Sequence, residues 1–399
     1  MKKLFIVASA FFLTFAACKK DKKTDPEPIP TPVTPADPNA SQKQQAKETY
    51  AKLAFAMYDD SYQGAINLKN KITAFLANRT SQNYTDCKTA WLSVRDIYGL
   101  TETFRFVDGP IDNPADGPEG FINAWPMDEA FVDYVVGSPT VGIINNATTY
   151  PTIDEATLLS ANENGGEKNI SLGFHAIEFL LWGQDLSATA AGMRPYTDYL
   201  ITGGTAANQM RRAQYLSVTM DILIAGLKQV KDAWDPTISG NYRETFVGMD
   251  NNTAIRKMFN SLSVLAGTEL SGERMQTAYD NSDQEDEHSC FSDNTHKDLY
   301  ANAKGMEILF KGSYTRTNAT VVSGYSLKDL SDLYDSSKST DLVNAISNSI
   351  TKIIAIPAPF DQAILGASPD RPKVLAGINA LLDQDTKTKA IALALGIQL

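Results

Sequence analysis

The chain has 399 residues, of which 43% are hydrophobic and 21% charged, and its formal net charge at pH 7 is −11. An acidic chain repels nucleic acid and anionic lipid, so these numbers argue against nucleic-acid binding and against electrostatic adsorption to membranes. A single hydrophobic core seldom supports more than about 300 residues, so we expect two domains.

The first 17 residues have the features of a secretion signal. Two lysines precede an apolar run at residues 4–15, which is too short for a membrane-spanning helix. Two alanines then precede Cys18, and small residues before a cysteine are typical of bacterial lipoboxes, in which that cysteine is lipidated. We therefore expect a lipoprotein signal peptide at 1–17 and a lipid on Cys18 that anchors the protein at the bacterial outer membrane.

The stretch that follows has the composition of a tether. Lysines are followed by six prolines between residues 26 and 38, and such a sequence favours a solvated, semi-extended segment over a packed one. Residues 18–41 are therefore predicted to be a lipidated, proline-rich tether.

Helical periodicity dominates the rest of the chain. Apolar residues spaced three and four apart are typical of one face of a helix. They recur at Tyr84, Cys87, Trp91, Val94 and Tyr98, and again at Leu216, Met220, Leu223, Leu227, Val230 and Trp234. Similar patterns cover the segments near 42–77, 253–270, 294–311, 337–355 and 372–396. Sustained alternation is hard to find, so the sequence predicts an all-α protein.

Weak internal similarity suggests a duplication. The segment 92–102, with Leu-Ser-Val and then Gly-Leu-Thr-Glu, resembles 262–269, with Leu-Ser-Val and then Gly-Thr-Glu. The segment 178–183 likewise resembles 307–312. Two adjacent glycines at 203 and 204 are the natural break. We expect two four-helix-bundle-like domains packed together, at 42–203 and 204–399, with long irregular loops.

One of those loops is rich in functional groups. Residues 108–129 mix turn formers, acids and aromatic residues, and they include Trp125, Asp128 and Glu129. A long loop in a compact domain is usually functional or disordered, and its aromatic content argues against disorder. Trp125, Asp128 and Glu129 are therefore candidate neighbours of a site.

The chain has only three histidines, and each stands beside polar residues. His175 and Glu178 lie three residues apart, so on a helix they share one face. An imidazole and a carboxylate in this arrangement provide half of a site for zinc or iron. The alternative is a buried histidine that donates to a carboxylate within a structural polar network.

The other two histidines, His288 and His296, lie in an acidic segment at 283–296. A solvated acidic loop is the simpler interpretation, but Cys290 and Phe291 in its centre argue against it. Carboxylates nearby should raise the pKa of both imidazoles by favouring their charged form, which opposes metal ligation.

Four further charged residues are candidate neighbours of the site: Glu102, Arg105, Glu273 and Arg274. Glutamate and arginine three residues apart are more often a structural pair than a catalytic one.

Besides Cys18, the chain contains only Cys87 and Cys290. Outside the cytoplasm, an oxidising compartment can join such a pair in a disulfide. Because Cys87 falls on the apolar face of a predicted helix, we favour a packed free thiol there.

Several other chemistries lack their motifs. The sequence contains no GxSxG elbow, no phosphate-binding P-loop and no GxGxxG fingerprint. The inverted zinc-protease motif HxxEH would need a histidine at position 179, where the chain has Phe179.

Together, the lipobox, the segment 173–183 with its GxHxxE motif, the loop at 125–129 and the run 285–296 resemble the imelysin family. That family includes the iron-regulated protein A group and proteins described as insulin-cleaving metallopeptidases. The resemblance implies two duplicated helical bundles at the cell envelope, a GxHxxE site at their junction formed by His175 and Glu178, and a link to iron acquisition.

Three functions are compatible with these features. The first is a lipoprotein that binds a metal or an iron-containing ligand, possessing iron or zinc as its cofactor and working with iron-uptake proteins of the envelope. The second is a zinc peptidase in which Glu178 is catalytic and a metal-bound water attacks, although catalytic zinc normally has three protein ligands. The third is a non-catalytic interaction scaffold. An approach of His288 or His296 to His175 would favour the peptidase.

Overall fold

The structure is a computed structural model that describes residues 37–187 and 189–399. The predicted signal peptide at 1–17, the lipidation site Cys18 and all but the end of the tether lie outside the described residues. Residues Asn39–Leu399 form one compact unit. Its described part is built from helices and one two-stranded hairpin, which confirms the all-α prediction. No helix within residues 37–187 and 189–399 is long and apolar enough to span a membrane.

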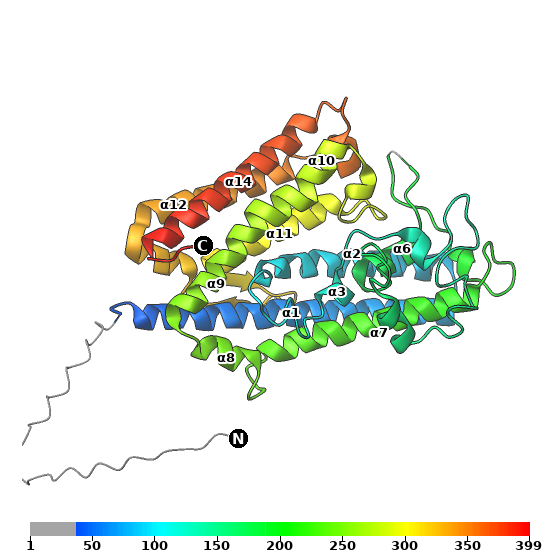
Figure 1. The fold of residues 1–399 in the computed structure, drawn as a ribbon, viewed down its shortest axis with the longest axis horizontal. Coiled ribbons are helices and arrows are strands. Elements are labelled where there is room, and N and C mark those ends of the chain that lie inside the picture. Colours follow the sequence, from blue (N-terminus) through cyan, green and yellow to red (C-terminus); the bar gives the residue numbers. More distant parts are fainter. Residues whose placement is uncertain (1–36, 188) are drawn as a thin grey trace, which may run out of the picture. The chain divides into compact units, whose positions relative to one another are not determined.

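Four helices form a first group (Figure 1). The longest helix, α1, packs against α2 and α7, and α6 packs against α2 and α7. The bounds are Ala40–Ala77 for α1, Ser81–Thr101 for α2, Gly173–Trp182 for α6 and Gln209–Trp234 for α7. The apolar stripes predicted on the second and fourth of these helices are buried, so the periodicity read from the sequence identifies their inner faces.

A second group follows along the chain. In Figure 1, α12 and α14 lie side by side, and they pack on α11, α9 and the continuation of α9. The bounds are Asn251–Val264 for α9, Leu265–Gln276 for the π-helix η3 that continues it, Thr295–Lys311 for α11, Leu327–Ile354 for α12 and Arg371–Ala394 for α14.

Shorter elements connect these helices. The short helices are η1 (Glu102–Phe104), α3 (Glu119–Ile122), α4 (Glu129–Val132), α5 (Glu155–Ala161), η2 (Tyr196–Tyr199), α8 (Tyr242–Gly248), α10 (Thr277–Asn281), η4 (Gln284–Asp286) and α13 (Phe360–Ile364). Strands β1 (Ser313–Thr315) and β2 (Val321–Ser323) pair antiparallel, with Tyr314 opposite Val322.

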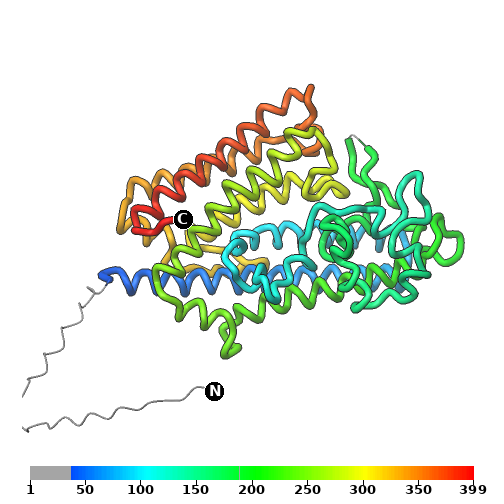
Figure 2. Tube along the Cα trace, viewed as in Figure 1, coloured from blue at the N-terminus to red at the C-terminus, as the bar shows by residue number. Residues whose placement is uncertain are grey.

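The break predicted at residues 203 and 204 lies just before α7. That helix packs against α1 and α6, which precede the break. The chain crosses from one helical group to the other only after α8, in the segment before α9 that is visible in the tube of Figure 2. The domain boundary at 203 and 204 stays a prediction.

One helix, α12, differs from its predicted segment for a local reason. α12 starts at Leu327, ahead of the predicted 337, and Asp335 interrupts it with φ −157° and ψ 93°. The carboxylate of Asp335 accepts from the backbone N–H of Lys338 at 2.9 Å, so it caps the second half as an N-cap residue does. The predicted segment therefore matches the part after this interruption.

The two groups meet closely where α2 crosses α11. A Cβ added to Gly99 would lie 2.7 Å from the Cβ of Ala301, and one added to Gly305 would collide with the carbonyl of Leu100. The side-chain amide of Asn302 donates a hydrogen bond to the carbonyl of Gly99 at 2.9 Å and so stabilises the crossing. The absence of side chains at both glycines thus brings the two backbones together.

Candidate functional site

The glycine of the GxHxxE motif, Gly173, is the first residue of α6. Gly173 has φ +83°, and a Cβ there would lie 2.6 Å from the carbonyl oxygen of Ile122 in α3. Only glycine combines this backbone conformation with such a close approach. Gly183, at φ +71°, ends the helix. All ten residues from Gly173 to Trp182 are buried, so the motif lies inside the protein rather than on its surface.

His175 and Glu178 form the pair that their spacing predicts. The Nδ1 atom of His175 lies 3.0 Å from Oε2 of Glu178, and both side chains are at most 2% exposed. The other oxygen of Glu178 accepts from the backbone N–H and the hydroxyl of Ser292, at 2.9 and 2.6 Å. The motif is thereby joined to the loop that precedes α11.

His288 approaches the same pair from that loop. Its ring centroid lies 4.9 Å from that of His175. Its Nδ1 atom lies 3.0 Å from the carboxylate of Asp298, and a guanidinium nitrogen of Arg95 lies 3.2 and 3.3 Å from its two ring nitrogens. On the outer side, the ring of Trp125 meets His288 edge-on at 5.7 Å.

The imidazole pKa values are lowered, which corrects the expectation that nearby carboxylates would raise them. Burial, with a smaller contribution from the positive charge of Arg95, holds the pKa of His175 well below its usual value. Burial and then Arg274 lower the pKa of His288 to about 4. Burial also lowers the pKa of His296. Loss of hydration on burial outweighs the attraction of the carboxylates, so all three rings are neutral at pH 7.

Burial acts in the opposite direction on the carboxyl group of the motif. It raises the pKa of Glu178 to about 8, and the hydrogen bonds from Ser292 reduce this effect only in part. A pair of neutral imidazole and protonated carboxyl is therefore favoured near pH 7, with one shared proton between Nδ1 and Oε2.

Next to the histidines, glutamates and arginines of both helical groups pair with one another. Arg274 binds Glu102 at 2.6 Å and Glu269 at 2.8 Å, while Arg105 binds Glu102 at 3.1 Å and approaches Glu269 at 3.9 Å. Residues five apart, such as 269 and 274, align on a π-helix, and η3 supplies that geometry. Glu102 and Glu269 are the two glutamates that the weak internal similarity of the sequence aligns.

A cavity of about 390 Å³ opens beside this cluster. Trp125 and His288 contribute to its wall, together with Arg105 and Arg274. Five glutamates also line it: Glu119, Glu163, Glu167, Glu269 and Glu273. His175 and Glu178 do not line this cavity and lie behind His288.

The structure gathers most but not all of the predicted neighbours of the site. Glu102, Arg105, Trp125, Glu273, Arg274 and His288 all lie at this cavity or directly behind it. Asp128 is instead exposed and caps α4, and Glu129 accepts from Gln184 near the acidic loop. His296 points back to the carbonyl of Asp293 at the start of α11. These three side chains are not part of the cavity wall.

Sequence reasoning missed several members of the cluster. Arg95 is 1% exposed and binds Asp298 at 3.1 Å as well as the side chain of Asn123. One signal was present: Arg95 follows Trp91 by four residues, so it interrupts the apolar face of α2 with a charge that must be paired. Asp298 and Asn123 gave no comparable signal.

The donor atoms around His175 do not converge as a metal shell. His175 Nε2 is buried and has no hydrogen-bond partner among the described residues, so it is one nitrogen left to ligate a metal. The nitrogens of His288 instead face Arg95 and Asp298, and a guanidinium at that position repels a cation. Within residues 37–187 and 189–399, no three His, Cys, Asp or Glu side chains are grouped as metal ligands. A resident zinc or iron ion therefore does not fit here.

The cysteines of the described part are both free and buried. Cys87 is fully buried on the inner face of α2, as predicted, and burial raises its pKa to about 12. Cys290 belongs to the loop before α11, and no disulfide joins the two.

Comparisons with known proteins agree with this architecture. A solved structure from Parabacteroides distasonis, described as an iron-regulated protein A precursor, aligns with a TM-score of 0.68 at 18% identity, covering 90% of this chain and 97% of that one. A solved imelysin-like protein from Psychrobacter arcticum aligns with a TM-score of 0.64 at 14% identity, covering 91% and 98%. These similarities show the fold. A search of curated proteins gave no match.

The sequence also matches a protein-family model. The family model described as Imelysin matches residues 54–388, which includes the GxHxxE motif, the buried cluster and every lining residue of the cavity beside His288. The chain belongs to the imelysin family.

Proposed function

We propose that this chain is an exported, lipid-anchored binding protein of the cell envelope, and that its cavity beside His288 holds a positively charged, iron-containing ligand for iron uptake. The observation that carries this proposal is the charge of the cavity wall. Five glutamates face two arginines there. Both arginines are already engaged with glutamates, so the remaining charge is negative.

The unpaired glutamates lie at the solvent side. Glu163, Glu167 and Glu273 are exposed and take part in none of the ion pairs found among the described residues. A group of like charges at one cavity attracts a cation and raises its local concentration. Carboxylates are also the oxygen ligands that hard metal ions prefer. A volume of about 390 Å³ accommodates a metal complex as well as a bare ion.

The zinc peptidase remains the second candidate, because His288 does approach His175 as that function would require. Against it, both nitrogens of His288 are occupied by Arg95 and Asp298. A catalytic zinc needs three protein ligands and an open position, and the side chains described here supply one open nitrogen. We therefore place binding ahead of catalysis, and an interaction scaffold after both.

Binding is tested with defined cations. The purified protein is dialysed against Fe²⁺, Zn²⁺ or hexaamminecobalt(III), an inert cationic complex, and its metal content is measured by elemental analysis. We expect about one equivalent of a cation per chain, and at least tenfold weaker binding in the variant Glu167→Gln with Glu273→Gln. The control Asp341→Asn with Asp383→Asn removes the same charge from exposed positions on α12 and α14.

Each outcome decides between the candidates. Equal binding by the cavity variant and the control would contradict a ligand site in this cavity. Peptide cleavage that requires added Zn²⁺ and disappears in Glu178→Gln would replace the binding function with the peptidase.

A further inference from the structure

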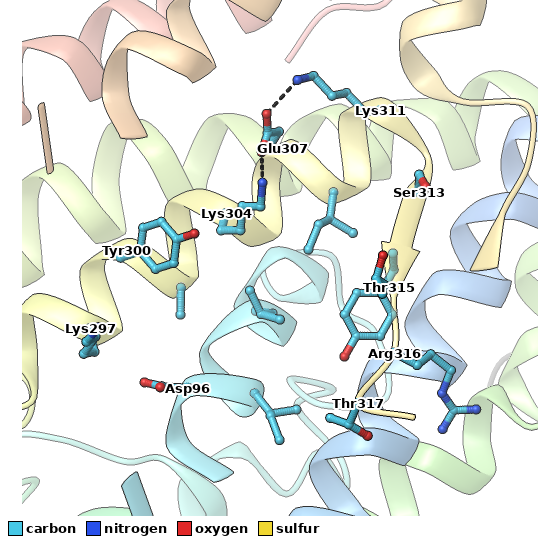
Figure 3. A pocket seen from close by; sticks show the side chains of 15 residues that line it. Asp96, Lys297, Tyr300, Lys304, Glu307, Lys311, Ser313, Thr315, Arg316 and Thr317 are labelled. Atoms are coloured by element: carbon cyan, nitrogen blue, oxygen red, sulfur yellow. Dashed lines mark hydrogen bonds and ion pairs between the residues drawn. The ribbon is translucent and has the colours of Figure 1, made fainter. Parts of the chain in front are cut away.

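A second cavity, larger than the one beside His288 and sharing no lining residue with it, lies where α2, α11 and β1 meet (Figure 3). Its volume is about 620 Å³, which falls within the range of small-molecule sites, roughly 300–1,000 Å³. Ile97 and Leu100 of α2 and Ala301 and Ile308 of α11 give it an apolar floor.

This floor is preformed. It is the α2–α11 crossing, in which Gly99 touches Ala301 and Gly305 touches the backbone of Leu100. Helices in backbone contact cannot move closer, so the floor keeps its form before a ligand arrives. A preorganised site binds without the cost of ordering its walls.

Three lysines line the cavity along α11. Lys297, Lys304 and Lys311 are seven residues apart, so two helical turns place them on one face. Figure 3 shows Glu307 between the last two, and both pair with it. One carboxylate thus serves two ammonium groups. Lys297 takes part in no ion pair found in the described part of the chain.

The cavity carries an excess of positive charge, whereas the protein as a whole is negative. Among its lining residues, three lysines and Arg316 face Asp96 and Glu307, and Arg316 is held from outside by Asp59 and Asp60. Apart from Arg316 and its two partners, three lysines face two carboxylates, so one net positive charge remains on the α11 side of the cavity, although the whole chain carries −11. A cationic edge over an apolar floor complements a molecule with an anionic head and an apolar body.

We propose that this cavity binds a small amphipathic anion, an apolar chain that carries a single carboxylate or phosphate. The head lies between Lys297 and Lys304, and the apolar body covers Ile97, Leu100 and Ile308. This site is independent of the proposed function at His288, since no lining residue is shared.

The test uses dodecanoate as the probe, titrated calorimetrically into the purified protein. We expect one equivalent to bind. Binding of acetate, which lacks the apolar body, and of dodecyltrimethylammonium, which has the opposite charge, should each be at least tenfold weaker. The variant Lys297→Ala with Lys304→Ala should bind dodecanoate at least tenfold more weakly. The control Lys373→Ala with Lys389→Ala loses the same charge from exposed positions on α14 and should bind as the wild type does.

Three results would overturn the proposal. One is equal dodecanoate affinity in the two double variants, and another is equal binding of the cationic amphiphile. The third is lysine-dependent binding to vesicles of phosphatidylglycerol without binding of free dodecanoate, which would make this surface a membrane contact and not a small-molecule site.

Discussion

His288 places its imidazole ring 4.9 Å from that of His175, although one residue comes from α6 and the other from the loop before α11. Asp298 and Arg95 hold the outer ring in place, and Glu178 holds the inner one. Neither histidine is isolated, and both belong to one buried polar network that connects the two helical groups. Changes in this network should therefore affect stability as well as any bound ligand.

The first prediction concerns His175→Ala. Removing the ring leaves Oε2 of Glu178 buried without its partner, and an unsatisfied buried polar group costs about 1–3 kcal/mol. We expect the free energy of unfolding to fall by that amount while the helix content stays unchanged, since α6 retains its backbone bonds. Urea denaturation followed by circular dichroism measures both. The control His296→Ala, in which a half-buried ring is lost, should cost less than about 1 kcal/mol; an equal loss in both would contradict the network.

The GxHxxE motif predicted the contact between His175 and Glu178. The residues that surround this pair lie far away in the sequence and were not predicted to contact it. The spacing of His175 and Glu178 fixes their shared face, and the apolar stripes of α2 and α7 fix which sides are buried. Helical periodicity does not predict that His288 contacts His175, because that contact depends on how a loop packs across two groups of helices. The pKa prediction was wrong for the same reason, since the depth of burial is a tertiary property.

The second prediction concerns the glycine of the motif. Gly173→Ala forces a side chain into φ +83° and within 2.6 Å of the carbonyl of Ile122. Strained backbone costs on the order of 1–3 kcal/mol, and the collision adds to it. We expect a loss of at least about 2 kcal/mol in urea denaturation. Gly248→Ala, where nothing lies within 4 Å and φ is not positive, is the control, and a comparable loss there would refute the steric explanation.

The third prediction concerns the arginine of the π-helix. Arg274→Met strips the buried carboxylate of Glu102 of its closest cation, and breaking one side of a buried ion pair costs about 3–5 kcal/mol. The double variant Arg274→Met with Glu102→Gln should recover part of this loss, because the uncompensated charge is gone. A double-mutant cycle from denaturant unfolding measures the coupling. Additive losses would show that the two side chains do not interact.

The π-helix also marks a limit of sequence analysis. The segment 253–270 was predicted as helical, and α9 with η3 occupies it and continues to Gln276. Helical periodicity gives no reason to align Glu269 with Arg274, since residues five apart diverge on an α-helix. Only the wider π turn brings them together, so Arg274 was identified as a candidate without its partner.

The fourth prediction concerns pH. Because burial raises the pKa of Glu178 to about 8, the folded state binds more protons than the unfolded state above the ordinary value of 4.5. Its contribution to stability is present below pH 4.5 and lost as pH rises through 8. His288, lowered to about 4, acts oppositely, and its effect ends about one pH unit above the ordinary value of 6.5.

Stability should therefore fall between pH 6.5 and 8, and Glu178→Gln should remove the share that Glu178 contributes, up to about 2 kcal/mol. Glu129, whose pKa burial raises to about 7, contributes a further share that both proteins keep. The glutamine keeps the shape and still accepts from Ser292. Unfolding free energies of both proteins at pH 6.5 and 8 provide the measurement. Parallel curves for wild type and variant would mean that Glu178 does not titrate in this range.

The last prediction counts thiols. Cys87 and Cys290 are buried and unpaired, and burial raises the pKa of both, so neither reacts readily as a thiolate. We expect no labelling by a thiol reagent in the native protein. After denaturation without reductant, two thiols per chain should react if Cys18 carries its lipid, and three if the unprocessed chain is used. Fewer than two would indicate that Cys87 and Cys290 become paired in the exported protein.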